Sequence, residues 1–356
     1  GCTALILAAY GLKDSISVVV PKQYGEIFNY DTMMNLKYEG TLNEKKNLKD
    51  AINIDKRIKS SMMIKQTLMN GSKANEDKEV QVRLFVPESL DKFKDYVHLL
   101  DKDTEGNIKL TDDTVVITEK LAKLLNLSVG DTITVGDDAG TAVDLKISSI
   151  AENYVYNYVY ISEKMYEEKF GEELKVNTVL LKLTEDGKTH EDEVAKDWLK
   201  KNDILVVTST SYVISSFEDI ISSLNSVVVL MIVCAAALAF VVLYNLTNIN
   251  VAERIREIAT IKVLGFTEKE SANYVYRENI VLSIIGIAVG LVMGIFLSNY
   301  IVSTIEMDIV MFGRSIHGIS FVYAAAFTLV FTLLVNISMY GKLNNISMVE
   351  SLKSVE

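Results

Sequence analysis

Three long stretches without a charged residue constrain the fold of this chain more than any other feature. They are Ile220–Ala252, Asn279–Ile305 and Ser315–Gly341. About 20 apolar residues in a helix cross a bilayer, so each stretch is long enough to span a membrane. We expect complete membrane-spanning helices at about 220–248, 279–305 and 316–341. The first stretch exceeds what a bilayer requires, so this helix should tilt or project from the membrane.

A shorter apolar segment, GCTALILAAYGL, begins the sequence. It is too short to cross a bilayer alone, and Gly1 follows neither a Met nor a basic leader. We expect residues 1–13 to be the outer end of a truncated membrane helix, and the sequence to be the C-terminal part of a larger protein. Lys13 and Asp14 mark the exit from the membrane.

The intervening residues 14–215 are hydrophilic and acidic. Residues 1–215 carry 28 Lys and Arg against 36 Asp and Glu, a net of −8 within −11 for the whole chain. An acidic balance without a basic face argues against a nucleic-acid partner. Cys2 and Cys234 both lie in apolar runs, which disfavours a structural disulfide.

Short alternating patterns predict a compact α+β domain at 14–215 and a helical membrane domain at 216–356. Strands are expected at 58–69, 80–86, 114–117, 142–150, 154–161, 177–183 and 204–207, and helices at 88–100, 119–125, 162–170 and 190–201. Tyr154, Tyr156, Tyr158 and Tyr160 alternate and should share one strand face. That face is either the floor of a groove or packed under a neighbouring lobe.

Basic residues in the short connections predict the orientation. The connection 247–278 contains five, whereas 304–318 contains only Arg314. The five are Arg254, Arg256, Lys262, Lys269 and Arg277. We therefore expect residues 250–266 and the C-terminus in the cytoplasm, and residues 14–215 outside the cell membrane.

The cytoplasmic segment NVAERIREIATIKVLGF, residues 250–266, has the pattern of a short amphipathic helix. Its apolar stripe comprises Val251, Ala252, Ile255, Ile258 and Ala259. Ile261 and Leu264 fall outside this stripe, towards the charged side. The pattern alone favours a helix lying in the membrane interface. The alternative is a helix that offers Ile261 and Leu264 to a cytoplasmic partner.

Three motifs resemble one family of membrane proteins. ERIREIATIKVLGF, followed by two hydrophobic spans, is similar to the coupling region of FtsX-like permeases, and GCTALILAAYGLKDSI resembles their first span. VVITEKLAKLLNLSVGDTITV, followed by IAENYVYNYVYISEKMY, resembles the extracytoplasmic core domain of MacB-type permeases over about residues 80–183. This resemblance implies a helical membrane domain carrying an extracytoplasmic α+β domain of the MacB core type.

The resemblance also implies a function. Such a chain is the permease subunit of an ABC transporter, and its short coupling helix, about 250–265 here, docks on a separate cytoplasmic ATPase that binds ATP and Mg²⁺. This chain would bind no cofactor itself and would not be an enzyme. Its partners would be that ATPase, a second permease half, the lipid bilayer and an extracytoplasmic accessory protein. The docking residues we expect are Glu253, Arg256, Glu257, Ile261, Leu264 and Gly265.

Two roles remain open for such a chain. The first is export or extraction of a peptide, an antibiotic or a lipid-like substrate, driven by the ATPase. The second is a non-transporting role, in which the outer domain controls a cell-wall hydrolase or senses a peptide. The spans contain almost no ionisable residues, which argues against an ion-coupled transporter.

Gly286, Gly290 and Gly294 recur every four residues and share one helix face. Such a face lets another helix approach closely in lipid. The neighbour is either a helix of the same subunit or one of a partner half, and the pattern does not choose between them.

Other motifs carry little chemistry. Gly187–Lys188–Thr189 ends like a phosphate loop, but Lys182 stands where the first glycine is required. The three histidines, His98, His190 and His317, show no metal-binding spacing. Residues 101–112 have the spacing of a calcium loop, but a strand pattern follows them, which favours an ordinary turn.

Overall fold

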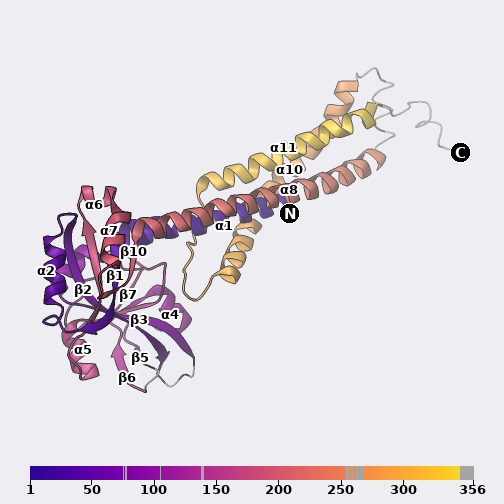
Figure 1. The fold of residues 1–356 in the computed structure, drawn as a ribbon. Coiled ribbons are helices and arrows are strands. Elements are labelled where there is room, and N and C mark those ends of the chain that lie inside the picture. The colour runs from indigo at the N-terminus through magenta and orange to yellow at the C-terminus, as the bar shows by residue number, and fades with distance from the viewer. Residues whose placement is uncertain are drawn as a thin grey trace. The chain divides into compact units, whose positions relative to one another are not determined.

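The computed structural model describes residues 1–74, 76, 78–104, 106–137, 140–253, 257, 260, 264 and 268–344 (Figure 1). The chain folds into two compact units. One, here called the membrane unit, comprises Gly1–Ile16, Ile221–Ile305 and Gly313–Glu356. The other, the sheet domain, comprises Ser17–Ile220 and Glu306–Phe312. The predicted outer domain, 14–215, did not include this second segment, which joins two membrane helices in sequence.

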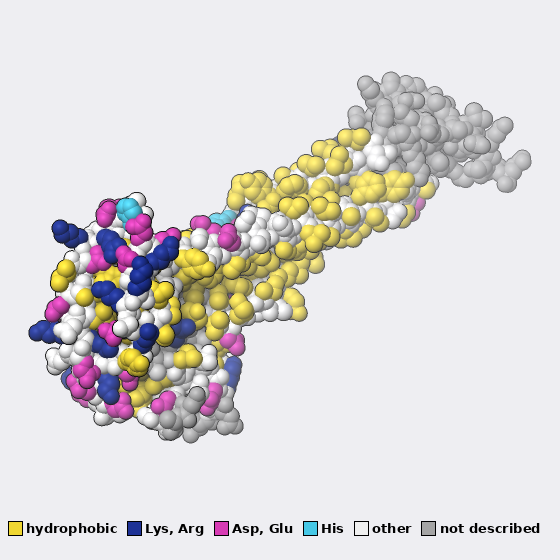
Figure 2. All heavy atoms as spheres, viewed as in Figure 1, with side chains coloured by type: hydrophobic (Ala, Val, Ile, Leu, Met, Phe, Trp, Pro, Cys, Tyr) yellow, Lys and Arg dark blue, Asp and Glu magenta, His cyan; other side chains and the backbone are white. Residues whose placement is uncertain are grey.

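Long apolar helices build the membrane unit. They are α1 (Cys2–Ser17), α8 (Thr210–Glu253), α10 (Glu268–Ile305) and α11 (Gly318–Asn344). Within the described residues, four segments are long and apolar enough to cross a membrane: Cys2–Ile27, Thr210–Leu246, Ile280–Ile305 and Gly318–Ser338. Figure 2 shows hydrophobic side chains along these helices and charged side chains over the sheet domain. The predicted fold class is confirmed.

Helix α8 is much longer than a bilayer is thick. Its 44 residues extend about 66 Å at 1.5 Å per residue, against a hydrocarbon core of about 30 Å. The helix begins at Thr210, in the sheet domain, and its residues from Ile221 belong to the membrane unit. One unbroken helix therefore runs through both units, and it starts about ten residues before the span expected at 220–248.

One sheet organises the second unit. Its strands are β1 (Thr32–Gly40), β2 (Ile58–Lys73), β3 (Glu79–Pro87), β4 (Val116–Thr118), β5 (Thr132–Gly136), β6 (Ala142–Lys146), β7 (Ser149–Ala151), β8 (Tyr158–Tyr160), β9 (Val176–Leu183) and β10 (Ile204–Ser209). Their order is β10-β1-β9-β2-β3-β8-β4-β7, and β5 pairs with both β2 and β6. The pairs β3–β8 and β4–β7 are parallel. The pairs β1–β10, β1–β9, β2–β3, β2–β5, β2–β9, β4–β8 and β5–β6 are antiparallel.

Short helices accompany the sheet. They are η1 (Pro21–Ile27, a π-helix), α2 (Lys46–Ile54), α3 (Leu90–Tyr96), α4 (Glu119–Leu124), α5 (Glu163–Phe170), α6 (Glu185–Thr189) and α7 (Glu191–Leu199). Ile52 of α2, Leu121 of α4, Tyr166 of α5 and Trp198 of α7 all enter one buried cluster with side chains of the strands. This cluster is the main core of the domain.

Alternate residues of β3 separate the main core from a second, aromatic layer. Val82, Leu84 and Val86 belong to the main core. Successive strand residues point to opposite faces, so Arg83 and Phe85 lie on the other face. Phe85 packs there against aromatic rings of β8, with centroids 6.3 Å away at Tyr158 and 5.3 Å away at Tyr160.

Several predicted elements differ in extent. The strand expected at 154–161 is limited to β8, because Tyr156 has a φ of +63° and breaks the alternation. The strand expected at 142–150 is divided into β6 and β7, and the helix expected at 88–100 ends at Tyr96. Elements β1 and α2 were not predicted.

The face that carries Tyr158 and Tyr160 is packed under a neighbouring lobe, which is the second of the two alternatives predicted for it. Tyr158 and Tyr160 are 4 % and 1 % exposed. The ring of Phe28, which follows η1, lies 5.9 Å from that of Tyr158, and the ring of Phe93 in α3 lies 5.9 Å from that of Tyr160. Residues near η1 and α3 therefore form the covering lobe.

The main core predicts a large difference between two leucine truncations. Leu84 is fully buried, whereas Leu68 on the neighbouring strand β2 is 55 % exposed. Leu84→Ala should lower the free energy of unfolding of the sheet domain by about 2–5 kcal/mol, because it leaves a cavity. Leu68→Ala, the matched control, should change it by less than about 0.5 kcal/mol.

Trp198 is the single tryptophan of the sequence and lies in this core, so its fluorescence reports on this domain alone during urea unfolding. Equal effects of the two truncations would show that this cluster is not the stabilising core.

Candidate functional site

The structure describes only part of the predicted docking helix at 250–265. Glu253 is the last residue of α8 and Glu257 is helical, and both side chains are exposed. Leu264 is 73 % exposed, and its backbone N–H donates to the carbonyl of Thr260 at 3.1 Å. The remaining predicted docking residues lie outside the described residues: Arg256, Ile261 and Gly265. Docking through this segment stays a prediction.

Two of the three predicted packing glycines lie against α1 of the same chain. A Cβ on Gly290 would come within 2.7 Å of the Thr3 Cβ, and a Cβ on Gly294 within 2.9 Å of the Leu7 Cβ. A Cβ on Gly286 would meet nothing within 4 Å. The first two glycines thus let α10 approach α1 closely. Contact of Gly286 with a partner half stays a prediction.

Asp14 joins two helices of the membrane unit. Its carboxylate accepts hydrogen bonds from the backbone N–H of His317, at 3.0 Å, and the hydroxyl of Ser320, at 2.6 Å. A negative charge is favourable there, at the N-terminus of α11. Near the other end of α1, the hydroxyls of Thr3 and Thr328 are 3.0 Å apart. Helix α1 is therefore bonded to α11 near both of its ends.

In the sheet domain, a buried glutamine binds the backbone of residues 153–155. Gln23 of η1 is fully buried. Its carbonyl oxygen accepts from the N–H groups of Tyr154, at 2.8 Å, and Val155, at 3.1 Å. Its amide nitrogen donates to the side-chain oxygen of Asn153 at 3.0 Å. These bonds pair backbone groups that no neighbouring strand pairs, so Gln23 fixes this stretch to η1.

The segment 306–312, here called the strap, binds the other side of the same stretch. The N–H of Tyr156 donates to the Ile309 carbonyl at 2.6 Å, and the N–H of Met311 donates to the Tyr154 carbonyl at 2.8 Å. Val155 and Val310 form an antiparallel bridge. The strap therefore acts as a short extra strand of the sheet domain, although the sequence places it between α10 and α11.

A buried ion pair holds the strap to α4. The Lys120 Nζ lies 3.2 Å from the Glu306 Oε2, and the two side chains are 9 % and 7 % exposed. The other carboxylate oxygen of Glu306 accepts from the backbone N–H of Phe312 at 2.8 Å. One carboxylate thus closes the strap on itself and attaches it to the domain.

These contacts could not be predicted from the sequence pattern. Neither Gln23 nor Lys120 belongs to a motif, and Glu306 looked like an ordinary residue of a connecting loop. The resemblance at 150–166 did mark residues 152–157, where the contacts converge. A signal in retrospect is Glu306 itself, a charged residue that directly follows a membrane span.

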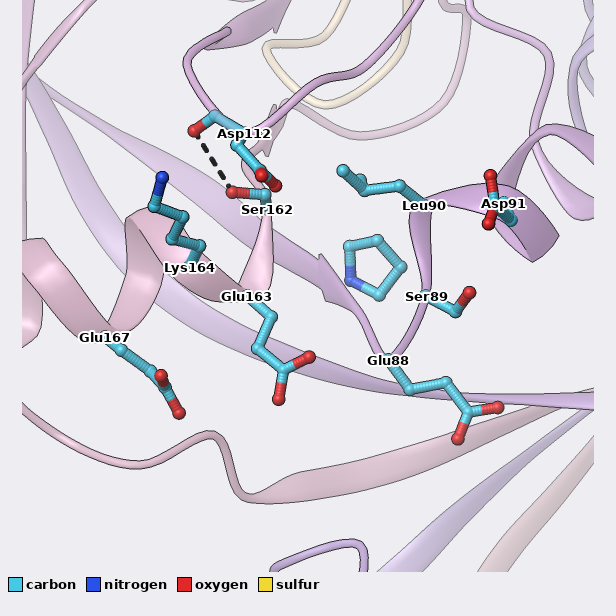
Figure 3. A pocket seen from close by; sticks show the side chains of 10 residues that line it. Glu88, Ser89, Leu90, Asp91, Asp112, Ser162, Glu163, Lys164 and Glu167 are labelled. Atoms are coloured by element: carbon cyan, nitrogen blue, oxygen red, sulfur yellow. Dashed lines mark hydrogen bonds between the residues drawn. The ribbon is translucent and has the colours of Figure 1, made fainter.

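Five acidic residues line a surface cavity of about 480 Å³ in the sheet domain: Glu88, Asp91, Asp112, Glu163 and Glu167. Figure 3 shows Glu88, Glu163 and Glu167 around it. The Glu88 Oε2 lies 2.8 Å from the Lys49 Nζ, and the Glu88 Oε1 lies 3.3 Å from the Lys92 Nζ. Burial raises the pKa of Glu163, helped by the nearby charges of Glu167 and Glu88.

Ser162, also on this cavity, caps α5 and donates to the Asp112 carbonyl at 3.2 Å. The contacts of Glu88 and Ser162 are structural, and the described residues of the cavity pair no nucleophile with a base.

The calcium-like spacing at 101–112 folds as a turn. One carboxylate oxygen of Asp101 accepts from the N–H groups of Asp103 and Thr104 and from the Thr104 hydroxyl. These hydrogen bonds lower the pKa of Asp101, and the bond from the Thr104 backbone N–H has the largest effect. No group of residues suited to holding a metal occurs in the described part of the chain.

Comparison with known protein families finds a match in the C-terminal third of the chain. Residues 229–348 match the family described as FtsX-like permease C-terminal, which confirms the predicted family for this part of the chain. No curated protein is similar enough to the chain to count as a match.

Two solved structures align with part of the chain. The periplasmic region of MacB from Actinobacillus actinomycetemcomitans is 12 % identical, with a TM-score of 0.35; the alignment covers 56 % of this chain and 97 % of that one. The extracellular domain of the ABC-type transporter YknZ from Gram-positive bacteria is 13 % identical, with a TM-score of 0.34, over 51 % of this chain and 100 % of that one. Neither structure identifies a substrate.

The ion pair between strap and α4 predicts a double-mutant effect. Lys120→Met should lower the free energy of unfolding of the sheet domain by about 3–5 kcal/mol, because it leaves the Glu306 carboxylate buried without its cation. Lys120→Met combined with Glu306→Leu should be less destabilising than the sum of the single changes, by about 0.5–3 kcal/mol.

Lys123→Met is the control. Lys123 lies on the same helix, is 54 % exposed and pairs with Glu119, so its removal should cost at most about 1 kcal/mol. Urea unfolding followed by Trp198 fluorescence measures all four variants. Additive single effects would show that Lys120 and Glu306 do not interact.

Proposed function

We propose, from the membership of residues 229–348 in the FtsX-like permease C-terminal family, that this chain is the membrane subunit of an ABC transporter. In this proposal a separate cytoplasmic ATPase hydrolyses ATP and pushes on residues 250–265. The membrane helices carry the movement to the sheet domain, which lies outside the cell and handles the substrate. The match to residues 229–348 is the observation that carries the proposal, because it includes the docking segment, two whole spans and part of a third.

The described part of the docking segment supports this role. Leu264 exposes most of its side chain, and Glu253 and Glu257 are exposed on the same short stretch. Burying a leucine against a partner contributes about 1.5–3 kcal/mol, which is a large part of a specific contact. The flanking charges would select the partner and its orientation.

The chain path supports the transmission of movement. The chain passes between the membrane unit and the sheet domain at four places: after residues 16, 220, 305 and 312. Two of these passages lead directly into Gln23 and the strap, which grip opposite sides of residues 154–156. A movement of α1 or of the α10–α11 pair is therefore delivered to one stretch of the sheet domain through covalent bonds and short hydrogen bonds.

Four further assignments belong to the proposal. The C-terminus is cytoplasmic, because the connection before α10 is rich in Arg and Lys. A second permease half completes the transporter. The substrate is a peptide, an antibiotic or a lipid-like molecule that the sheet domain meets outside the cell, with an accessory protein as a further partner there. ATP and Mg²⁺ are bound by the ATPase and not by this chain.

Leu264→Asp tests the docking role. The full-length permease is reconstituted with its ATPase in lipid vesicles, and both ATPase binding and the substrate-dependent part of ATP hydrolysis are measured. Loss of a buried leucine should weaken binding of the ATPase by about 10- to 150-fold and abolish the substrate-dependent hydrolysis. Leu199→Asp is the matched control, since Leu199 is 51 % exposed on α7 of the sheet domain; it should leave both unchanged.

Unaltered ATPase binding in Leu264→Asp would refute docking through this residue. The same vesicles separate the two roles left open by the sequence. A transporter moves or extracts its substrate when ATP is supplied, whereas a regulatory protein couples hydrolysis to its outer domain without moving any solute.

A further inference from the structure

Arg83 is an arginine without an acidic partner. It lies on β3, half-buried, on the face that carries the aromatic layer. Its Nε is buried and donates to no acceptor, and none of the ion pairs among the described residues includes this side chain. The contact its guanidinium makes is with the ring of Tyr156, 3.8 Å from the ring centroid.

That contact does not compensate for the burial. A cation over an aromatic ring contributes about 0.5–2 kcal/mol, whereas a buried donor left without an acceptor costs about 1–3 kcal/mol. The guanidinium has five N–H donors in a planar fork. Among the described residues no acceptor faces the buried Nε, and a bound anion would supply one.

Two further unpaired atoms belong to residues 157–160, the segment that pairs with β3. Within the described residues, the buried side-chain atoms without a hydrogen-bond partner are Arg83 Nε, Asn157 Oδ1 and the Tyr160 hydroxyl. Arg83 is in register with Tyr158 in the parallel pair of β3 and β8, and its backbone N–H donates to the Asn157 carbonyl at 2.7 Å. Among the described residues, these unpaired atoms thus belong to β3 and to the neighbouring segment 157–160.

The groups around Arg83 are tyrosines. Tyr24 lies close enough to Arg83 for the two groups to interact electrostatically. Burial raises the pKa of Tyr30 and of Tyr158, and the positive charge of Arg83 opposes this rise. Each of these hydroxyls therefore stays protonated and can donate a hydrogen bond. A cation among protonated hydroxyls attracts an anion.

Hydrogen bonds to the strap and to Asn153 hold the Tyr156 backbone in a strained conformation. Its φ of +63° is unusual for a residue with a side chain. Its N–H donates to Ile309, and its carbonyl accepts from the Asn153 amide at 2.8 Å. A strained backbone that the surroundings enforce is common at ligand sites. Here it places the Tyr156 ring over Arg83 while leaving that ring 36 % exposed.

We propose that Arg83, with Tyr24, Tyr30, Tyr156 and Tyr158, binds a phosphate group. A forked guanidinium combined with hydroxyl donors matches the several oxygens of a phosphate, which accept multiple charge-assisted bonds. The unpaired Asn157 oxygen can accept from a hydroxyl beside that phosphate.

The proposed site is close in sequence to two membrane helices, so phospholipid headgroups are one source of the phosphate. Tyr24 follows the end of α1 by seven residues, which span at most about 25 Å. The strap that holds Tyr156 is directly continuous with α10. The phosphate is therefore carried either by a lipid headgroup or by a small soluble anion.

The test uses the full-length chain in phosphate-free detergent with three probes: dihexanoyl phosphatidylglycerol, dihexanoylglycerol, which lacks the phosphate, and inorganic phosphate. Titration calorimetry measures each affinity. Arg83→Met should weaken binding of the phosphate-bearing probes at least about tenfold, the loss expected for a hydrogen bond to a charged group. Lys37→Met removes the same charge from an exposed position on β1 and should leave binding within about twofold.

The probes separate the two sources. Binding of phosphatidylglycerol much tighter than inorganic phosphate assigns the site to a lipid headgroup or lipid-like substrate, and equal binding assigns it to a free phosphate. Equal affinity for dihexanoylglycerol, no binding of any probe, or wild-type binding by Arg83→Met would overturn the proposal.

Thermal unfolding separates this role from a structural one. Phosphate should raise the midpoint of the wild type and not that of Arg83→Met. Without phosphate, Arg83→Met should unfold no earlier than the wild type, because it removes an unpaired cation. A lower midpoint for the variant, together with no effect of phosphate on the wild type, would show that Arg83 only packs.

Discussion

The hydrogen bonds around residues 154–156 join the two segments of the sheet domain that are far apart in sequence, Ser17–Ile220 and Glu306–Phe312. This stretch bends at Tyr154 and Tyr156, and β8 begins only at Tyr158, so its backbone groups need partners from elsewhere. Gln23 supplies them from one side and the strap from the other. Buried backbone groups left unpaired are costly, so both segments must be in place for this part of the domain to fold. Each of these segments also continues into a membrane helix.

The apolar spans and most elements of the sheet domain could be predicted from the sequence, because both depend on local pattern. A run without charges such as Asn279–Ile305 has few alternatives to a membrane helix. Strands such as β3 and β9 carry dense runs of β-branched and apolar residues. Element β1 was missed because Thr32–Gly40 mixes Met, Asn, Lys and Glu, and it becomes a strand only by pairing between β9 and β10.

The candidate sites depend on contacts distant in sequence, which local pattern does not reveal. Lys120 and Glu306 are 186 positions apart and form an ion pair because the chain returns from the membrane between them. The tyrosine alternation gave the correct face for Tyr158 and Tyr160, but it did not reveal the positive φ of Tyr156, whose N–H bonds to the strap. Docking residues such as Arg256 are predictable only from resemblance, since an exposed charged surface has no packing pattern of its own.

The strap also has a consequence for how this domain is defined. A continuous fragment covering 17–220 contains every strand of the sheet and every helix that covers it, yet it lacks 306–312. In such a fragment the Lys120 ammonium would face a gap, and the edge at 154–156 would be open to water or to another molecule. The outer domain is thus discontinuous in the gene although it is one body in space, and its last strand reaches it only once α10 has been synthesised.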